Sequence, residues 1–158
     1  MFNQDLINSA YAIPFIAMEL QSRGLKKSIL VELTGMTDTK LKRHAQSAKV
    51  SRSKSPRAGD YGIRWFFQDK ERLVHSCNVI RLHQEYRKEY NRAVTLLHTT
   101  ISYCEMVSSP VLDINQIAFL IKYFSSNAIT LEICTSCHSY YIRQTEEFTK
   151  CCAHCFAD

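Results

Sequence analysis

Apolar residues recur every three or four positions along most of the chain, which is the spacing that places them on one face of an α-helix. The first such segment covers residues 12–23, with Pro14 in its first turn, where a missing N–H costs little, and Gly24 directly after it. A longer helix is expected from Lys70 to about Tyr90. The pattern therefore predicts a mainly α-helical protein.

Two more apolar stripes extend this helical region. One precedes the break at residues 108–110 and consists of Val94, Leu97, Ile101 and Cys104. The other follows Asp113, which has the spacing of a capping box with Gln116, and consists of Ile114, Ile117, Ile121 and Phe124. We expect both stripes to face the protein core or a subunit interface.

Two short segments near the amino terminus have the pattern of a helix-turn-helix. Apolar residues on one face predict a helix over residues 25–33, Gly35 suits a sharp turn, and a second helix is expected over residues 37–47. The residues of this second helix expected to face inward are Leu41 and Ala45, and those expected outward are Lys40, Arg43, His44 and Gln46. Ordinary packing of two helices is the alternative interpretation.

Positive charge is concentrated in the second of these helices and directly after it. No acidic residue occurs between Asp38 and Asp60, and residues 48–62 have the composition of a basic linker. Such a segment attracts the phosphates of nucleic acid. The residues predicted to contact DNA are Lys40, Lys42, Arg43, His44, Lys49, Arg52, Lys54 and Arg57. A solvated charged loop is the alternative interpretation.

The overall composition is that of a folded protein of ordinary charge. Hydrophobic residues make up 46% of the 158 residues, and the net charge of +5 is moderate, so the distribution of charge is more informative than its total. The longest apolar stretches, near residues 10–18 and 117–120, are shorter than the stretch of about 18 residues that a membrane span requires. We therefore expect a soluble protein without a membrane partner.

The last quarter of the chain contains two CxxC pairs, Cys134 with Cys137 and Cys152 with Cys155, separated by fourteen residues. This spacing is typical of a structural zinc site with four thiolate ligands, in which each pair occupies one tight turn and a hairpin between the pairs brings the turns together. Four protein ligands leave no open position for water or substrate. The predicted ion, one Zn²⁺, would hold structure and perform no catalysis.

Other interpretations of these cysteines are less favoured. A disulfide framework would require an oxidising compartment, whereas residues 1–5 lack the pattern of a secretory signal, so we expect a cytoplasmic protein. A redox role would need only one CxxC pair. Cys151, His138 and His154 lie close to the predicted ligands, but the spacing favours Cys152.

The sequence contains no arrangement of residues typical of an enzyme. His75, His83 and His98 have no metal-ligand spacing with carboxylates, and neither a glycine-rich phosphate loop nor a Ser/His/Asp arrangement is recognised. Cys77 and Cys104 fall on apolar helical faces, so both are predicted to be small core residues. We expect a protein that is not an enzyme.

Several motifs resemble those of one family when taken in order. The basic helix and linker are followed by Trp65-Phe66, by Val74-His75-Ser76-Cys77-Asn78, and by Leu131-Glu132-Ile133-Cys134-Thr135-Ser136-Cys137 with the closing CxxC pair. This order resembles the C subunit of the bacterial flagellar master transcription activator (FlhC). The resemblance covers nearly the whole chain, and its most specific parts are the Trp-Phe element, the His-x-Cys-Asn segment and the two CxxC pairs.

The resemblance implies a function and a set of partners. Members of this family bind one zinc ion through four cysteines, which correspond here to Cys134, Cys137, Cys152 and Cys155. They assemble with a small helical D subunit, bind promoter DNA and recruit RNA polymerase. Related activators switch on conjugative-transfer genes instead of flagellar genes.

The sequence is predicted to divide into two domains: a helical DNA-binding and subunit-association domain, residues 1–128, and a zinc-binding domain, residues 129–158. Three functional hypotheses follow. The first is a promoter-binding subunit of a transcription activator. The second is a zinc-stabilised adaptor that binds only proteins. The third is a nuclease, which would need acidic clusters for a catalytic metal that the basic segment lacks.

Overall fold

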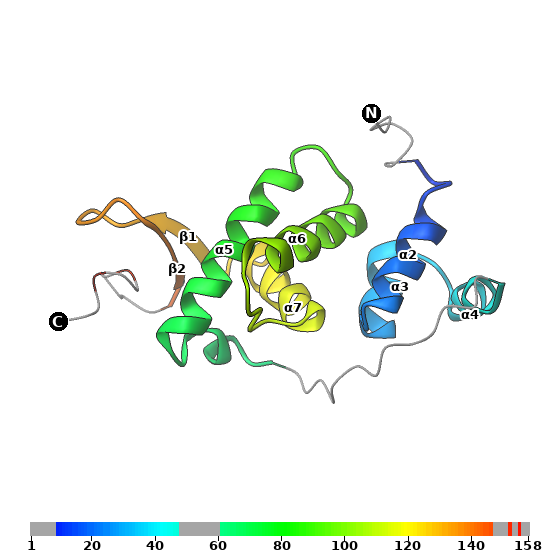
Figure 1. Cartoon of the computed structure of the whole chain (residues 1–158), viewed down its shortest axis with the longest axis horizontal. Coiled ribbons are helices and arrows are strands. Elements are labelled where there is room, and N and C mark those ends of the chain that lie inside the picture. The colour runs from blue at the N-terminus through cyan, green and yellow to red at the C-terminus, as the bar shows by residue number, and fades with distance from the viewer. Residues whose placement is uncertain (1–8, 48–60, 147–151, 153–154, 156–158) are drawn as a thin grey trace.

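The chain forms a row of helices that ends in a two-stranded hairpin (Figure 1). The computed structural model describes residues 9–47, 61–146, 152 and 155. The described elements are α2 (Ile13–Ser22), α3 (Lys27–Thr34), α4 (Asp38–Ser47), the 3₁₀ helix η1 (Ile63–Phe67), α5 (Lys70–Tyr86), α6 (Arg92–Met106), α7 (Ile114–Ser125), β1 (Ile129–Ile133) and β2 (Tyr140–Gln144). This confirms the predicted fold class. Each of these helices is too short or too polar to cross a membrane.

The helices α2, α3 and α4 lie together at one end of the molecule (Figure 1). Pro14 is in the first turn of α2, and Gly24 follows that helix with a φ of 90°, a left-handed conformation that glycine adopts without strain. α2 packs against both α3 and α4. Leu20, Leu30 and Leu41, one from each helix, are buried in the same core. All three helices were predicted, and their bounds agree with the sequence pattern to within two residues.

A turn of three residues joins α3 to α4, as in a helix-turn-helix. Gly35 has a φ of 65°, and its N–H donates to the carbonyl oxygen of Val31 at 2.9 Å, which ends α3. Met36 is buried in the core. The hydroxyl oxygen of Thr37 accepts from the N–H of Lys40 at 3.4 Å, at the start of α4. The turn therefore directs α4 back across α2.

The helices α5, α6 and α7 form the middle of the molecule. Each begins after a side chain that accepts hydrogen bonds from the free N–H groups of the first turn; these residues are Asp69, Asn91 and Asp113. Asp113 and Gln116 form the predicted capping box. α5 ends at Tyr86 and not near Tyr90, because the cap of the next helix follows closely at Asn91 and the chain must turn before it.

The buried face of α6 differs from the predicted stripe. Leu97 and Ile101 are half-buried and Cys104 is exposed, so the prediction that Cys104 is a core residue is wrong. The residues that α6 buries are Ala93, Val94, Thr95, Leu96, Thr99, Thr100 and Tyr103. A buried threonine can satisfy its hydroxyl within the helix, as Thr100 does by donating to the carbonyl oxygen of Leu96 at 2.8 Å.

Tyr103 is fully buried and organises the chain between α6 and α7. Its hydroxyl oxygen accepts from the N–H groups of Val111 at 3.0 Å and Leu112 at 3.2 Å, and it lies 2.7 Å from Nδ1 of His75. The hydrogen bond between the hydroxyl and the imidazole links α5 to α6. The two backbone bonds hold the segment before α7 against α6.

The hairpin shares its core with the helices. β1 and β2 are antiparallel, with Leu131 opposite Ile142. Ile129 and Ile142 belong to the main core cluster, Leu131 packs against it, and the strands contact α5 and α7.

The two strands flank the first CxxC pair, whereas the sequence predicted a hairpin between the two pairs. The apolar run 129–133 precedes the first cysteine and supplies the strand that was not predicted.

Tyr61 is the first described residue after the predicted basic linker. Residues 48–60 of the predicted linker lie outside the described residues. The ring of Tyr61 lies 5.3 Å from that of Trp65 and 6.2 Å from that of Phe119 between centroids. Its carbonyl oxygen accepts from the hydroxyl of Tyr123 at 2.8 Å. Tyr61 is therefore part of the packed structure and not of the linker.

Replacing Gly35 by alanine should lower the free energy of unfolding by about 1–2 kcal/mol, because an L-residue in the left-handed region brings its Cβ too close to the backbone. No other atom lies within 4 Å of the added Cβ, so the cost arises from the backbone conformation alone. Gly62 is equally open but has a φ of −62°, so Gly62→Ala is the matched control and should be neutral. Urea unfolding measures both variants, and equal losses would contradict this explanation.

Candidate functional site

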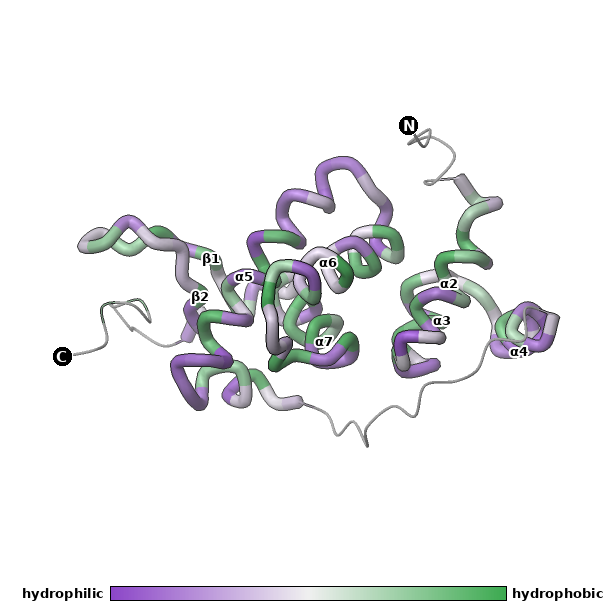
Figure 2. Tube along the Cα trace, in the orientation of Figure 1, coloured by the Kyte–Doolittle hydropathy of each residue, from purple (hydrophilic) through white to green (hydrophobic). Residues whose placement is uncertain are grey.

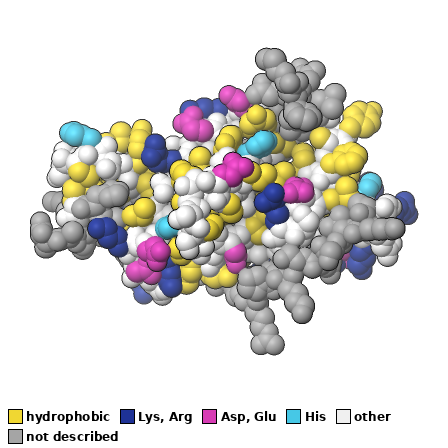
Figure 3. Space-filling view, in the orientation of Figure 1, with side chains coloured by type: hydrophobic (Ala, Val, Ile, Leu, Met, Phe, Trp, Pro, Cys, Tyr) yellow, Lys and Arg dark blue, Asp and Glu magenta, His cyan; other side chains and the backbone are white. Residues whose placement is uncertain are grey.

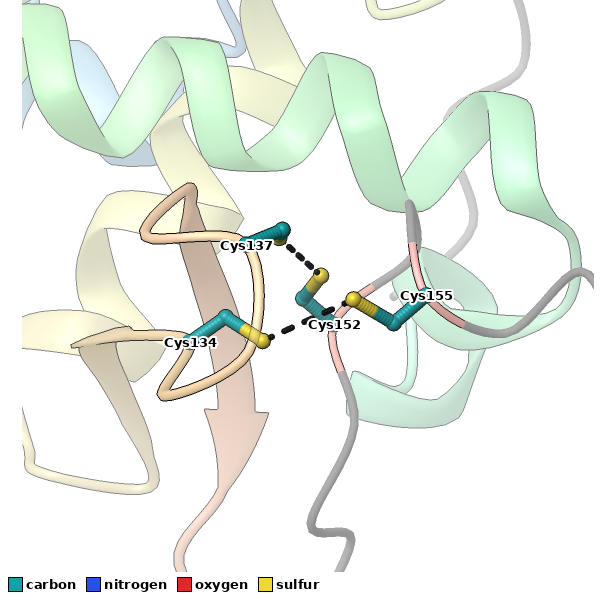
Figure 4. A group of neighbouring side chains, drawn as sticks. All are labelled: Cys134, Cys137, Cys152 and Cys155. Carbon is teal, nitrogen blue, oxygen red and sulfur yellow. Dashed lines mark hydrogen bonds between the residues drawn. The ribbon is translucent and has the colours of Figure 1, made fainter.

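The first CxxC pair lies in the turn that joins β1 to β2. The N–H of Cys134 donates to the carbonyl oxygen of Ser139, and the N–H of His138 donates to the carbonyl oxygen of Cys134, both at 2.9 Å. His138 has a φ of 57°, so the chain reverses tightly after Cys137. These bonds close the turn and leave both cysteine side chains on one side of it (Figure 4).

The second CxxC pair is brought against the first. The sulfurs of Cys134 and Cys155 are 3.7 Å apart, those of Cys137 and Cys152 are 3.2 Å apart, and all four lie within 4.8 Å of one another (Figure 4). Four thiolates at about 2.3 Å from a tetrahedral ion lie about 3.8 Å from each other. The four predicted ligands therefore form a group that fits a metal ion.

The residues considered as alternative ligands are placed differently. His138 is exposed and does not belong to the metal-ligand group found among the described residues. Cys151 and His154 lie outside the described part of the chain. All six cysteines that the structure describes are free, and the sulfur separations are well above the length of about 2.05 Å of a disulfide bond.

The turn prepares its own thiols for metal binding. The N–H groups of Cys137 and Ser136 donate to the Cys134 sulfur and lower the pKa of that thiol to about 6. The backbone and side chain of Ser139 lower the pKa of Cys137 in the same way. In the second pair, burial raises the pKa of Cys152, and hydrogen bonding to the Cys137 sulfur raises the pKa of Cys155. The hydrogen bonds of the turn therefore lower the pKa values of the first pair, whereas burial and the neighbouring sulfurs raise those of the second pair.

One face of the hairpin carries the cysteines together with a polar cluster. The ring of Tyr141 packs with Cys134 and Cys152, and its hydroxyl donates to Glu132 at 3.0 Å. The guanidinium of Arg143 donates to Glu132 at 2.6 and 2.9 Å, which lowers the pKa of that carboxyl group. Since side chains alternate along a strand, Ile129, Leu131 and Ile142 lie on the other face, where they pack with the core of the helices.

Two residues of α5 fasten the hairpin to the helical body, and the sequence analysis did not identify this role. Cys77 is buried as predicted, and its thiol donates to the carbonyl oxygen of Tyr140 at 3.2 Å. Burial raises the pKa of Cys77 to about 11, so the thiol keeps the proton that it donates. The guanidinium of Arg81 lies 4.8 Å from the centre of the Tyr140 ring. Because Cys77 and Arg81 are four residues apart on one helix, their spacing is the signal that could have paired them.

The described part of the predicted DNA-contacting set lies on α4, which is mainly hydrophilic (Figure 2). Lys40 and Arg43 are exposed, and no ion pair involves them within the described residues. Lys42 is exposed but pairs with Asp38 at 3.2 Å, and His44 is half-buried. Of the predicted inward residues, Leu41 is buried and Ala45 is half-buried. The predicted contacts outside the described residues are Lys49, Arg52, Lys54 and Arg57.

The cysteine cluster and α4 lie at opposite ends of the molecule. Figure 1 shows the hairpin at one end of the long axis, α5, α6 and α7 in the middle, and α4 at the other end. Lys and Arg side chains are visible at the α4 end (Figure 3). A metal ion in the cluster would therefore not touch a ligand bound to α4. An effect of the ion on that ligand would have to be transmitted through the helices between them.

Comparison with known proteins adds no family to this description: no protein-family model matches the chain, and no curated protein matches it. The resemblance to the activator C subunit therefore stays a prediction based on the motifs. The structure establishes the helical fold, the hairpin and the group of four cysteines. These observations are the basis of the functional proposal.

Replacing Cys137 by serine should abolish metal binding, because it removes one of four thiolates from a closed site. It should also lower the yield of folded protein, since structural metal sites contribute about 10–16 kcal/mol of apparent binding free energy in small peptides. Metal content per chain, measured by elemental analysis of the purified protein, should fall from one to near zero.

The matched control for this experiment is Cys104→Ser. Cys104 is exposed and lies outside the cluster, so this variant should keep its full metal content and yield. Equal metal content in Cys137→Ser and Cys104→Ser would show that the four cysteines do not form the metal site.

Proposed function

We propose that this protein is a DNA-binding subunit of a transcription activator whose shape depends on one structural zinc ion. The observation that carries the proposal is the arrangement of α2, α3 and α4. α3 and α4 are joined by a turn of three residues, and both pack on α2. This arrangement leaves the most basic helix on the surface at the end of the molecule, where a helix-turn-helix places its recognition helix.

The side chains of α4 support a contact with DNA. Lys40 and Arg43 are three residues apart, so they lie on one face of the helix, and this face is separate from the inward face that contains Leu41. Lys42 lies on another face, where Asp38 partly neutralises it. Lys40 and Arg43 are therefore the described residues best placed to bind phosphates or base edges.

Zinc is the metal that best suits the cluster. Four cysteine thiolates in tetrahedral spacing are the soft ligand set typical of structural zinc. All four positions are supplied by protein, so no position is open for a substrate, and a structural role without enzymatic activity is proposed. The ion would hold the segment that contains Cys152 and Cys155 against the hairpin, and Cys77 and Arg81 hold the hairpin on α5.

The proposed partners follow from the resemblance and from one exposed surface. Tyr11 and Phe15, at the start of α2, are 88% and 69% exposed, and apolar surface of this kind suits a protein contact. We propose that a small helical D-type subunit binds there, and that the complex recruits RNA polymerase in the cytoplasm to flagellar or conjugative-transfer promoters. The same surface favours the second candidate function, a zinc-stabilised adaptor that binds only proteins.

Replacing Lys40 and Arg43 together by alanine should weaken binding to a random-sequence DNA duplex and flatten its dependence on salt. Each lost phosphate contact should reduce the slope of log K against log salt concentration by about 0.9. Fluorescence anisotropy over a series of salt concentrations measures this slope, with and without a co-expressed D-type subunit.

The control for this experiment is Lys88→Ala, because Lys88 is exposed, lies two residues after the end of α5, where it pairs with Glu85, and is away from α4. Its slope should equal that of the unmodified protein. A slope unchanged by the α4 substitutions would exclude α4 as the DNA contact. Absence of DNA binding at low salt, with and without the D-type subunit, would favour the adaptor.

A further inference from the structure

A cavity of about 520 Å³ lies between α3 and the helices α5, α6 and α7. Its volume is within the range of about 300–1,000 Å³ that is usual for small-molecule sites. Much of its wall is apolar; the apolar lining includes Ile29, Leu33, Leu96, Phe119 and Ile121. The cavity therefore has the size and the lining of a ligand site, and it lies at the junction between the helix-turn-helix unit and the rest of the protein.

A buried histidine lines this cavity without a partner for one ring nitrogen. His83 is only 8% exposed, and its Nδ1 atom has no hydrogen-bond partner among the described residues. Burial, and next the charge of Arg87, lower the pKa of His83 to about 4, so the ring is neutral at physiological pH. Nδ1 itself has almost no accessible surface, so the small part of the imidazole that reaches the cavity belongs to its other atoms, and the other ring nitrogen, Nε2, is the atom available to a polar ligand group.

The rim of the cavity carries an excess of positive charge. Arg87, Arg92 and Lys122 line the cavity together with one carboxylate, that of Glu32. Arg92 and Lys122 lie 3.8 and 3.9 Å from Glu32, so the two ion pairs are long. Three cations and one carboxylate leave a net charge of +2 at the rim, which favours an anionic ligand group.

The connection between α3 and α7 keeps the two sides of the cavity in place. Asn115 is buried; its side-chain oxygen accepts from the N–H of Lys26 at 2.7 Å, and its side-chain nitrogen donates to the carbonyl oxygen of Gly24 at 3.0 Å. The ammonium of Lys26 also lies 5.3 Å from the centre of the Phe119 ring. These contacts hold α3 against α7, so the cavity is built into the fold.

We propose that this cavity binds a small amphipathic carboxylate that carries a second polar group. The apolar part of the ligand occupies the cavity, its carboxylate pairs with Arg87, Arg92 and Lys122, and the second polar group bonds to Nε2 of His83. A ligand bound here contacts α3 and the central helices at once, so it stabilises the position of the helix-turn-helix unit. The binding site does not depend on the proposed DNA-binding function.

Three probes separate the parts of this proposal: 10-hydroxydecanoate, decanoate and 1-decanol, each measured by isothermal titration calorimetry with the full chain. 10-Hydroxydecanoate should bind most tightly, decanoate less tightly and 1-decanol most weakly, because only the first has both polar groups. Equal binding of decanoate and 1-decanol, or no saturable binding of any probe, would overturn the proposal.

Variants locate the binding in the cavity. Replacing Arg87 and Arg92 together by glutamine should weaken both carboxylates about tenfold and leave 1-decanol unchanged. His83→Phe should remove the preference for 10-hydroxydecanoate over decanoate, and Ala118→Trp, which fills the cavity, should abolish binding. The matched control Lys88→Gln removes a charge that does not line the cavity and should bind like the unmodified protein.

Circular dichroism and metal content establish that each variant is folded. The two arginine substitutions change exposed side chains, so they test the proposal even where Ala118→Trp disturbs the core. Unchanged affinity of decanoate in the arginine variant, or an unchanged preference in His83→Phe, would overturn the proposal.

Discussion

The register of the β1–β2 hairpin is the constraint on which the carboxyl-terminal part of the structure depends. With Leu131 opposite Ile142, the apolar side chains lie on one face and join the core of the helices. The other face carries Glu132, Tyr141 and Cys134, and the second cysteine pair packs there. A slip of one residue would exchange the two faces and separate both the core contact and the four sulfurs.

The helices connect two ends of the molecule that have different chemistry. At one end, α5 holds the cysteine hairpin through the thiol of Cys77 and the guanidinium of Arg81. At the other end, Asn115 of α7 joins the chain between α2 and α3, and so positions the helix-turn-helix unit. The metal centre and the basic helix do not meet (Figure 1). The proposed zinc ion would therefore maintain the protein architecture, and α4 is the surface proposed to contact DNA.

Local signals predicted the parts of the structure that depend on residues close in sequence. The capping box of Asp113 and Gln116, the turn at Gly35 and the four clustered cysteines were all predicted from spacing alone. The buried face of α6 was not, because Thr100 satisfies its hydroxyl within its own helix and can be buried like an apolar residue. The cavity at His83 depends on contacts between residues far apart in the sequence, which spacing does not reveal. The strand before the first cysteine and the pairing of Cys77 with Arg81 had local signals that the prediction did not use, namely the alternation of residues 129–133 and a spacing of four residues.

X-ray absorption at the zinc edge tests the central claim most directly, because it reports the atoms around the ion in the intact protein. The account predicts four sulfur atoms at about 2.3 Å and no nitrogen or oxygen in the first coordination shell. A shell that contains histidine nitrogen or water oxygen would contradict a closed site formed by Cys134, Cys137, Cys152 and Cys155, and so would folded protein that contains no zinc.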